Sequence, residues 1–257
     1  MTPSHLSAPT ARPTALAAGP ATTTVGLIAD ASIEAAARHA AERLGLGLAA
    51  FDPGAVDAGD RGALFAFASA CEAVSVDPAV VGVDRLPPAH LDALRDAGHR
   101  VWPDPVVVRL SQDRALARSA LGAAGFPVAP TDRGSVAATG ASLSVLVARR
   151  PSGWWRARVA VAAGEGPVPR VSTLARARAL ASAVADGLGT TGSLAVDLVL
   201  SPSGDLAVAG VTAGPRPPAA LGGAALDDHL RALLDQPFAA TTRSGPDQPV
   251  PAVASLP

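Results

Sequence analysis

Short apolar segments alternate with helical segments in the first part of the chain, and this alternation constrains the fold more than any other feature. TVGLIA, LGLAAFD and AVSVD have the length and apolar character of buried strands. SIEAAARHAAERLG and RGALFAFASA, which follow the first two, have helical spacing, and Pro87 and Pro88 open a further helix. Strands that alternate with helices favour a parallel sheet covered on both faces. We therefore expect a Rossmann-like α/β domain over residues 24–110, with Ser32 capping the first helix and Gly45 ending it.

The second half of the chain has a different pattern. After the helical segment QDRALARSALGAAG, the turn sequence PSG twice joins two apolar segments, SLSVLVARR to WWRARVAVAA and SLAVDLVLS to DLAVAGV. A helical segment follows each pair, and the second, AALDDHLRALLD, places Asp227 and Asp228 in its first turn. This order predicts an α+β domain with an antiparallel sheet over residues 111–240. Residues 1–23 and 241–257 lack periodicity and are expected to form a flexible arm and tail.

Composition excludes several classes of protein. Of the 257 residues, 49% are hydrophobic, which is enough for a sizeable core, and the net charge of −1 offers no basic surface for nucleic acid. No segment approaches the roughly 20 apolar residues that a membrane-spanning helix needs. Cys71 is the only cysteine and the histidines do not cluster, so neither a disulfide framework nor a zinc site is expected. We expect a cytoplasmic protein without nucleic-acid or membrane partners.

Four stretches of the chain, taken in order, resemble one enzyme family. They are VWPDPVVVRLSQDRALARSALGAAGFPVAP, LSVLVARRPSG, GTTGSLAVDLVLSPSGDLAV, and PRP followed by DDHLRALLDQPF. They are similar to the linker helix, the ELSVLVARRPSG segment, the VELF–NE hairpin and the PRPHNSG loop of the N5-carboxyaminoimidazole ribonucleotide synthetases. Those enzymes belong to the ATP-grasp class and act in purine synthesis. The resemblance implies that residues 24–110 form a pre-ATP-grasp domain and residues 111–240 an ATP-grasp domain.

The same resemblance shows where the chain departs from the family. The family uses ATP and Mg²⁺ to activate bicarbonate as carboxyphosphate and carboxylates the amine of aminoimidazole ribonucleotide. This sequence contains no lysine to bind phosphates, and ADASIEAA, without glycine, replaces the family's GGGQLGRM turn. Only the eleven residues TDRGSVAATGA separate Pro130 from Ser142, where the family has a strand–glycine loop–strand unit. We therefore expect a reduced ATP-grasp domain that lacks most of the central flap.

The family's metal-binding positions have also changed. Asp197 replaces the glutamate of VELF and is the one candidate Mg²⁺ ligand. The second glutamate falls on Gly210, or on Thr212 if the alignment is shifted to match Pro-Arg-Pro, and neither is a carboxylate. The loop after Arg216 reads PPAALGG where the family has HNSGH.

These departures predict a catalytically degenerate homologue of the synthetases, with a ligand-binding or partner role at most. No catalytic residue is assigned. The candidate anion-binding residues are Arg149, Arg150 and Arg216. No cofactor is expected, and ATP and Mg²⁺ are expected only if the family activity survives. A second copy of the chain or a complete synthetase is the expected partner. The alternative is an active enzyme that carries out ATP-dependent carboxylation of 5-aminoimidazole ribonucleotide with bicarbonate.

Overall fold

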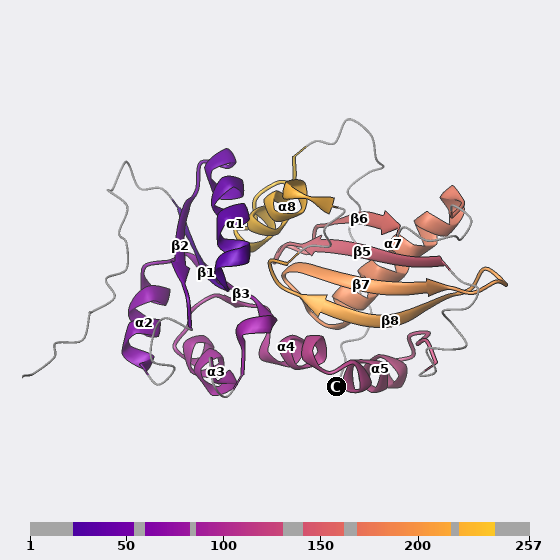
Figure 1. Cartoon of the computed structure of the whole chain (residues 1–257), viewed down its shortest axis with the longest axis horizontal. Helices are drawn as coiled ribbons and strands as arrows, with labels where there is room; N and C mark the ends of the chain where they lie inside the picture. Colours follow the sequence, from indigo (N-terminus) through magenta and orange to yellow (C-terminus); the bar gives the residue numbers. More distant parts are fainter. Residues whose placement is uncertain are drawn as a thin grey trace, which may run out of the picture.

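Two four-stranded sheets, joined by helices, make up the computed structural model (Figure 1). The structure describes residues 23–53, 60–82, 86–130, 141–161, 169–216 and 221–239. The expected arm over residues 1–23 therefore lies outside the described residues except for Thr23, and the expected tail over residues 241–257 lies wholly outside them. Within those ranges, no helix has both the length and the apolar character needed to cross a membrane.

The first sheet is parallel, with strand order β2-β1-β3-β4, as the alternation of strands and helices predicts. Helix α1 covers one face, where its apolar side chains pack with those of β1, and α2 and α3 cover the other. The elements are β1 (Thr24–Ile28), α1 (Ala31–Arg43), β2 (Gly47–Phe51), α2 (Arg61–Ser69), β3 (Ala73–Val76), α3 (Pro88–Asp96) and β4 (Val101–Trp102). The expectation of a Rossmann-like domain is confirmed for this sheet.

The predicted cap of α1 is wrong by two residues. Asp30, not Ser32, is the N-cap residue: it has extended backbone angles, and its Oδ1 accepts a hydrogen bond from the Ser32 N–H at 3.0 Å. Both residue types suit this position, and the chain enters the helix early enough to put Ser32 in its first turn. At the other end, Gly45 follows the C-cap with φ +66°, so the glycine ends the helix as predicted.

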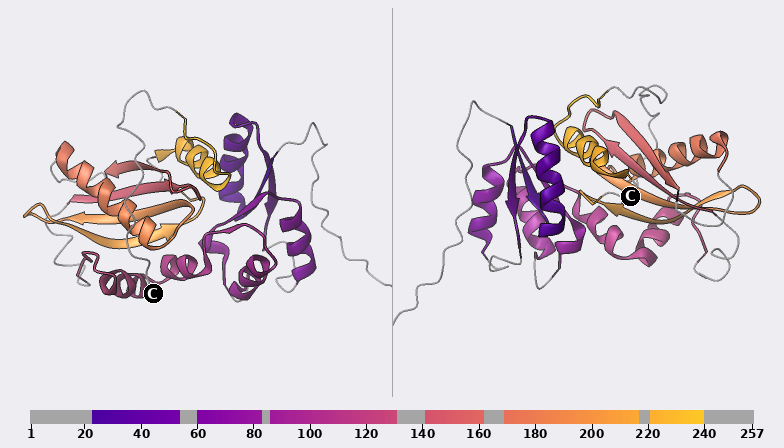
Figure 2. Two further views of the ribbon diagram at one scale, coloured as in Figure 1. Left: turned by 180° about the vertical axis from the view of Figure 1, so that it is seen from behind. Right: turned by 45° about the horizontal axis from the view of Figure 1, so that its top comes forward.

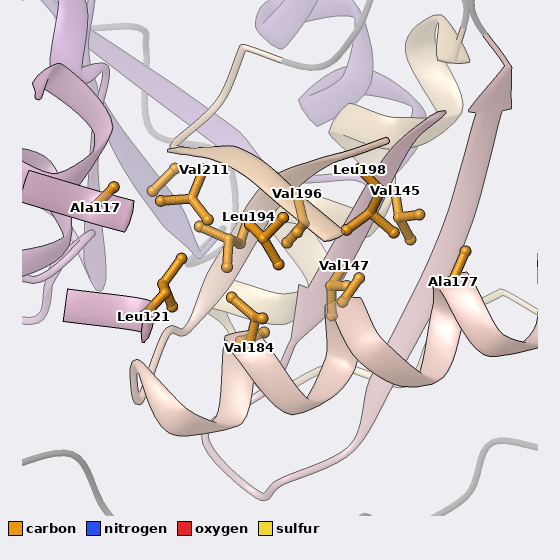
Figure 3. Close-up of a cluster of buried hydrophobic side chains, with 14 of the residues drawn as sticks. Ala117, Leu121, Val145, Val147, Ala177, Val184, Leu194, Val196, Leu198 and Val211 are labelled. Atoms are coloured by element: carbon orange, nitrogen blue, oxygen red, sulfur yellow. The ribbon is translucent and has the colours of Figure 1, made fainter. Parts of the chain in front are cut away.

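The second sheet is antiparallel, with strand order β6-β5-β7-β8, and both predicted hairpins are present. Helices α5 and α7 pack against one of its faces and, with side chains from β5, β7 and β8, build the largest hydrophobic cluster among the described residues (Figure 3). The elements are α4 (Pro105–Gln112), α5 (Arg114–Ala123), β5 (Ala141–Arg149), β6 (Trp155–Val161), α7 (Val171–Gly187), β7 (Gly192–Leu200) and β8 (Leu206–Ala213). The expected flap deletion falls on residues 131–140, outside the described residues.

Helix α8 (Gly223–Leu233) lies between the two sheets (Figures 1 and 2). Its leucines Leu226, Leu230 and Leu233 join the core formed by β1 and α1. Its alanines pack against the second sheet on the face that α7 leaves uncovered. The helix begins at Gly223, so the prediction that Asp227 and Asp228 lie in its first turn is wrong. One helix therefore belongs to the packing of both sheets.

Candidate functional site

Three charged residues meet where the first sheet faces the loop after β8. Asp30 follows β1, Asp77 follows β3, and Arg216 lies in the Pro-Arg-Pro loop. The Arg216 guanidinium donates to Asp77 Oδ2 from Nη2 at 2.7 Å and from Nε at 3.2 Å, and to Asp30 Oδ2 from Nη2 at 3.0 Å. Because the carboxyl ends of parallel strands are where α/β sheets bind ligands, this triad is the first candidate site.

The loop that carries Arg216 is held against β3 by a glycine. Gly214 has φ +107°, and a Cβ there would lie 2.8 Å from Pro78 Cδ and 2.9 Å from the Val76 carbonyl oxygen. Only glycine fits both the backbone angle and the space. The preceding residue is fixed as well, because the Ala213 N–H donates to Ser111 Oγ at 2.9 Å. These contacts fix the backbone at Ala213 and Gly214, directly before Pro215 and Arg216.

The charges of the triad stabilise one another. Hydrogen bonding to Asp77 is the main cause that raises the pKa of Arg216, and the charge of Asp30 acts in the same direction. The pKa of Asp30 is lowered, first by its hydrogen bonds from Ser32 and then by Arg216. Counted at their formal charges, the two carboxylates and the guanidinium together carry a net charge of −1.

The candidate metal ligand lies on the second sheet. Val196 and Leu198 point into the core (Figure 3), so Asp197 lies on the opposite face of β7, as expected from the alternation of side chains. Its cross-strand neighbour on β8 is Gly210. A Cβ on Gly210 would lie 4.0 Å from Asp197 Oδ2 and 3.8 Å from Arg114 Nε. The residue opposite this carboxylate thus has no side chain, and a guanidinium lies nearby.

Thr212 does not take the place of Gly210. It pairs with Ala195, two residues along β7 from Asp197. The irregularity of pairing between Asp197 and Leu198 leaves Ala209 without a direct partner, and this sets the register. Among the described residues, no group of three or more His, Cys, Asp or Glu could hold a metal ion.

The other two candidate anion-binding arginines lie elsewhere, each with an acidic residue of its own. Arg149 Nε donates to Asp186 Oδ1 at 2.6 Å. Arg150 Nε lies 3.2 Å from Asp235 Oδ1, and the guanidinium also bonds Ser152. The structure therefore does not bring Arg149, Arg150 and Arg216 together through any shared contact in its described part.

A buried histidine, which sequence reasoning did not select, connects the two sheets. His229 of α8 accepts a hydrogen bond at Nδ1 from the Ser193 N–H of β7 at 3.0 Å. Its Nε2 lies 2.8 Å from Ser75 Oγ of β3. Since Nδ1 is the acceptor, the neutral ring carries its proton on Nε2 and donates to the serine. The ring therefore cannot act as a base toward Ser75, and the pair is structural. Burial lowers the pKa of His229 to about 4.

Gly192 lies against this histidine, and its replacement by alanine is expected to destabilise the protein by about 2 kcal/mol. Its φ is +78°, and a Cβ would lie 3.1 Å from both His229 Cε1 and Leu233 Cδ2. Strain in the left-handed region costs about 1–2 kcal/mol, and crowding adds to this cost. Chemical denaturation measures the change. Gly98→Ala is the matched control, because Gly98 has φ +88° with no atom within 4 Å of the added Cβ. An equal loss in both variants would show that the contact with His229 contributes nothing.

Comparison with solved structures identifies the fold of the chain. No protein-family model and no curated protein matches the sequence. Among solved structures, N5-carboxyaminoimidazole ribonucleotide synthetase from Thermotoga maritima matches with a TM-score of 0.69 at 17% identity, covering 85% of this chain and 77% of that one. The Staphylococcus aureus enzyme matches at 0.65 and 14% identity, covering 84% and 78%. The Aspergillus clavatus enzyme in complex with ADP and aminoimidazole ribonucleotide matches at 0.65 and 13%, covering 84% and 77%.

These matches span both sheets, since they cover most of the chain and of each neighbour. The resemblance that the four sequence stretches indicate is confirmed at the level of the fold. At sequence identities of 13–17%, the matches show a shared fold but not a shared activity. The chain therefore has the fold of the N5-carboxyaminoimidazole ribonucleotide synthetases.

Proposed function

We propose that this chain is a non-catalytic relative of the synthetases, which keeps their fold and serves as a binding protein for a ligand or a protein partner. The observation that carries the proposal is the pairing of Asp197 with Gly210 on β7 and β8. At this pair of strands the family resemblance calls for two carboxylates. The chain offers one, and Arg114 lies beside the empty position.

The physical argument concerns Mg²⁺ and phosphate. Mg²⁺ that bridges the phosphates of ATP is held by hard oxygen ligands in near-octahedral geometry, and carboxylates also offset its charge. A single carboxylate with a guanidinium close to the second position is a poor ligand set, because the guanidinium repels the cation. The sequence also supplies no lysine for the phosphates. The residues present do not fit a Mg²⁺–ATP complex, and no catalytic step is assigned to them.

A protein partner is the other part of the proposal. A second copy of the chain or a complete synthetase would be recognised through surfaces that the shared fold preserves. The competing proposal is ATP-dependent carboxylation by the chain itself. Solved neighbours with ADP or ATP bound show that this fold can hold a nucleotide. If the carboxylation activity survived in this chain, Asp197 would be the residue that binds its Mg²⁺.

Turnover distinguishes the two proposals. The purified chain, supplied with Mg²⁺-ATP, bicarbonate and 5-aminoimidazole ribonucleotide, is expected to release no ADP above the level without ribonucleotide, because single losses of charge stabilisation already cost orders of magnitude in rate. Asp197→Asn is the matched control for a contaminating enzyme, since only activity of this chain would depend on that carboxylate. Ribonucleotide-dependent ADP release that Asp197→Asn removes would contradict the proposed function.

A further inference from the structure

The Asp77 carboxylate receives the kinds of hydrogen bond that a bound anion receives in a binding site. Its side chain is 3% exposed, Oδ1 accepts the Ala79 N–H at 3.0 Å, and Oδ2 accepts both N–H groups from Arg216. A backbone amide and an arginine on one acidic group are the donors that proteins use for bound carboxylates and phosphates. The Asp77 side chain thus occupies the acceptor position next to Arg216.

Asp30 occupies a second anion-binding position at the same edge. It lies at the N-terminus of the 13-residue helix α1, and its Oδ1 accepts the Ser32 N–H while its Oδ2 accepts from Arg216. The N-terminus of a helix attracts anions through its free N–H groups and its dipole. Two internal carboxylates therefore engage the arginine and the helix terminus that an acidic ligand would use.

From these contacts we infer that Asp30 and Asp77 act as built-in anions that close the Arg216 site to phosphate monoesters. The inference rests on the proposed function, in which the chain acts on no ribonucleotide and Arg216 holds no anionic substrate. The Arg216 side chain is 41% exposed, so a solute can reach it. Gly214 lies tightly against Val76 and Pro78, so we expect the backbone of the loop to stay in place when the partners of Arg216 change.

The test is a gain of binding in the variant Asp30→Asn/Asp77→Asn. Asparagine retains the oxygen that accepts each backbone N–H and is also a good N-cap residue, so the fold is expected to survive. The local charge changes from −1 to +1. Calorimetric titration is carried out with ribose 5-phosphate and separately with inorganic phosphate. The wild-type chain is expected to show no binding up to the highest concentration tested, and the variant to bind with a Kd at least about tenfold below that concentration. Binding of both probes would indicate a phosphate site, and binding of the sugar phosphate alone a monoester site.

Two controls isolate the contribution of Arg216. Asp227→Asn frees Arg43 from a 2.6 Å ion pair and adds one positive charge at the opposite end of α1 from Asp30. It should leave the affinity unchanged. Arg216→Gln in the double variant should remove the gain. If the double variant fails to fold, Asp30→Asn alone serves, since its side chain is 40% exposed.

An unchanged phosphate affinity in the folded variant would overturn the inference, as would an equal gain with Asp227→Asn or a gain that survives Arg216→Gln. The two proposals fail separately. ADP release by the wild-type chain contradicts the proposed function and, with it, the closure of the Arg216 site. An unchanged affinity of the double variant contradicts this inference alone.

Discussion

Replacing Asp228 by alanine is expected to lower the free energy of unfolding by about 3–5 kcal/mol, the usual cost of removing one partner from a buried ion pair. Asp228 is 3% exposed, and its two oxygens accept from Arg158 Nε at 2.5 Å and Arg156 Nη1 at 3.3 Å. Without the carboxylate, the guanidinium groups of Arg156 and Arg158 on β6 would lose the acidic residue that they share, and Arg156 would keep only the Ala239 carbonyl oxygen and the Phe238 ring. Because α8 also packs in the core of the first sheet, the loss should affect both sheets.

The neighbouring residue supplies the control for this prediction. Asp227 accepts from Arg43 Nη2 at 2.6 Å, but the arginine side chain is 49% exposed. An exposed pair of this kind contributes about 0–1 kcal/mol, so Asp227→Ala should have a small effect. Chemical denaturation of both variants measures the difference. Equal losses would contradict the assignment of the stability to the buried cluster.

The stability of the protein is expected to fall by roughly 3 kcal/mol as the pH is lowered from about 6.5 to about 4. The native state holds His229 neutral, with its pKa lowered from 6.5 to about 4 by burial. Over this interval the unfolded chain binds a proton at this residue and the native state does not, at about 1.4 kcal/mol per pH unit. The stabilising effect of the neutral ring is complete above pH 6.5 and lost as the pH falls through this range.

Protonation in place is disfavoured by the hydrogen bonds as well as by burial. A proton on Nδ1 would point at the Ser193 N–H, which now donates to that nitrogen. Denaturation curves from pH 7 to pH 4 measure the slope, and His229→Gln, which cannot titrate, should reduce it by about one bound proton. A variant slope equal to that of the wild type would show that other groups cause the acid sensitivity.

Local patterns in the sequence were sufficient to predict most of the fold. The parallel sheet follows from strands that alternate with helices, and the two hairpins follow from apolar segments joined by PSG. The double role of α8 could not be predicted in this way. Its leucines show one apolar stripe, and the sequence does not indicate that its alanines face a second sheet. His229 lies within that stripe, next to Leu230, and this was the available sign of its burial.

The candidate site was predicted in part. The face of β7 on which Asp197 lies could be predicted from the alternation of side chains along the strand. Whether Gly210 or Thr212 lies opposite it could not, because this depends on how β7 and β8 pair. Arg216 was selected for its prolines, but its partners Asp30 and Asp77 lie 186 and 139 residues away. Asp77 directly follows a buried parallel strand and Asp30 comes two residues after another, and these positions were the signal that they would meet at one edge.

Titration of the wild-type chain with Mg²⁺-ATP by isothermal calorimetry tests the central claim most directly. The account predicts no heat of binding up to millimolar nucleotide, because Asp197 faces a glycine and no lysine is present to bind the phosphates. Binding with a micromolar Kd that requires Mg²⁺ and is weakened by Asp197→Asn would contradict it, since the metal and phosphate site would then be intact.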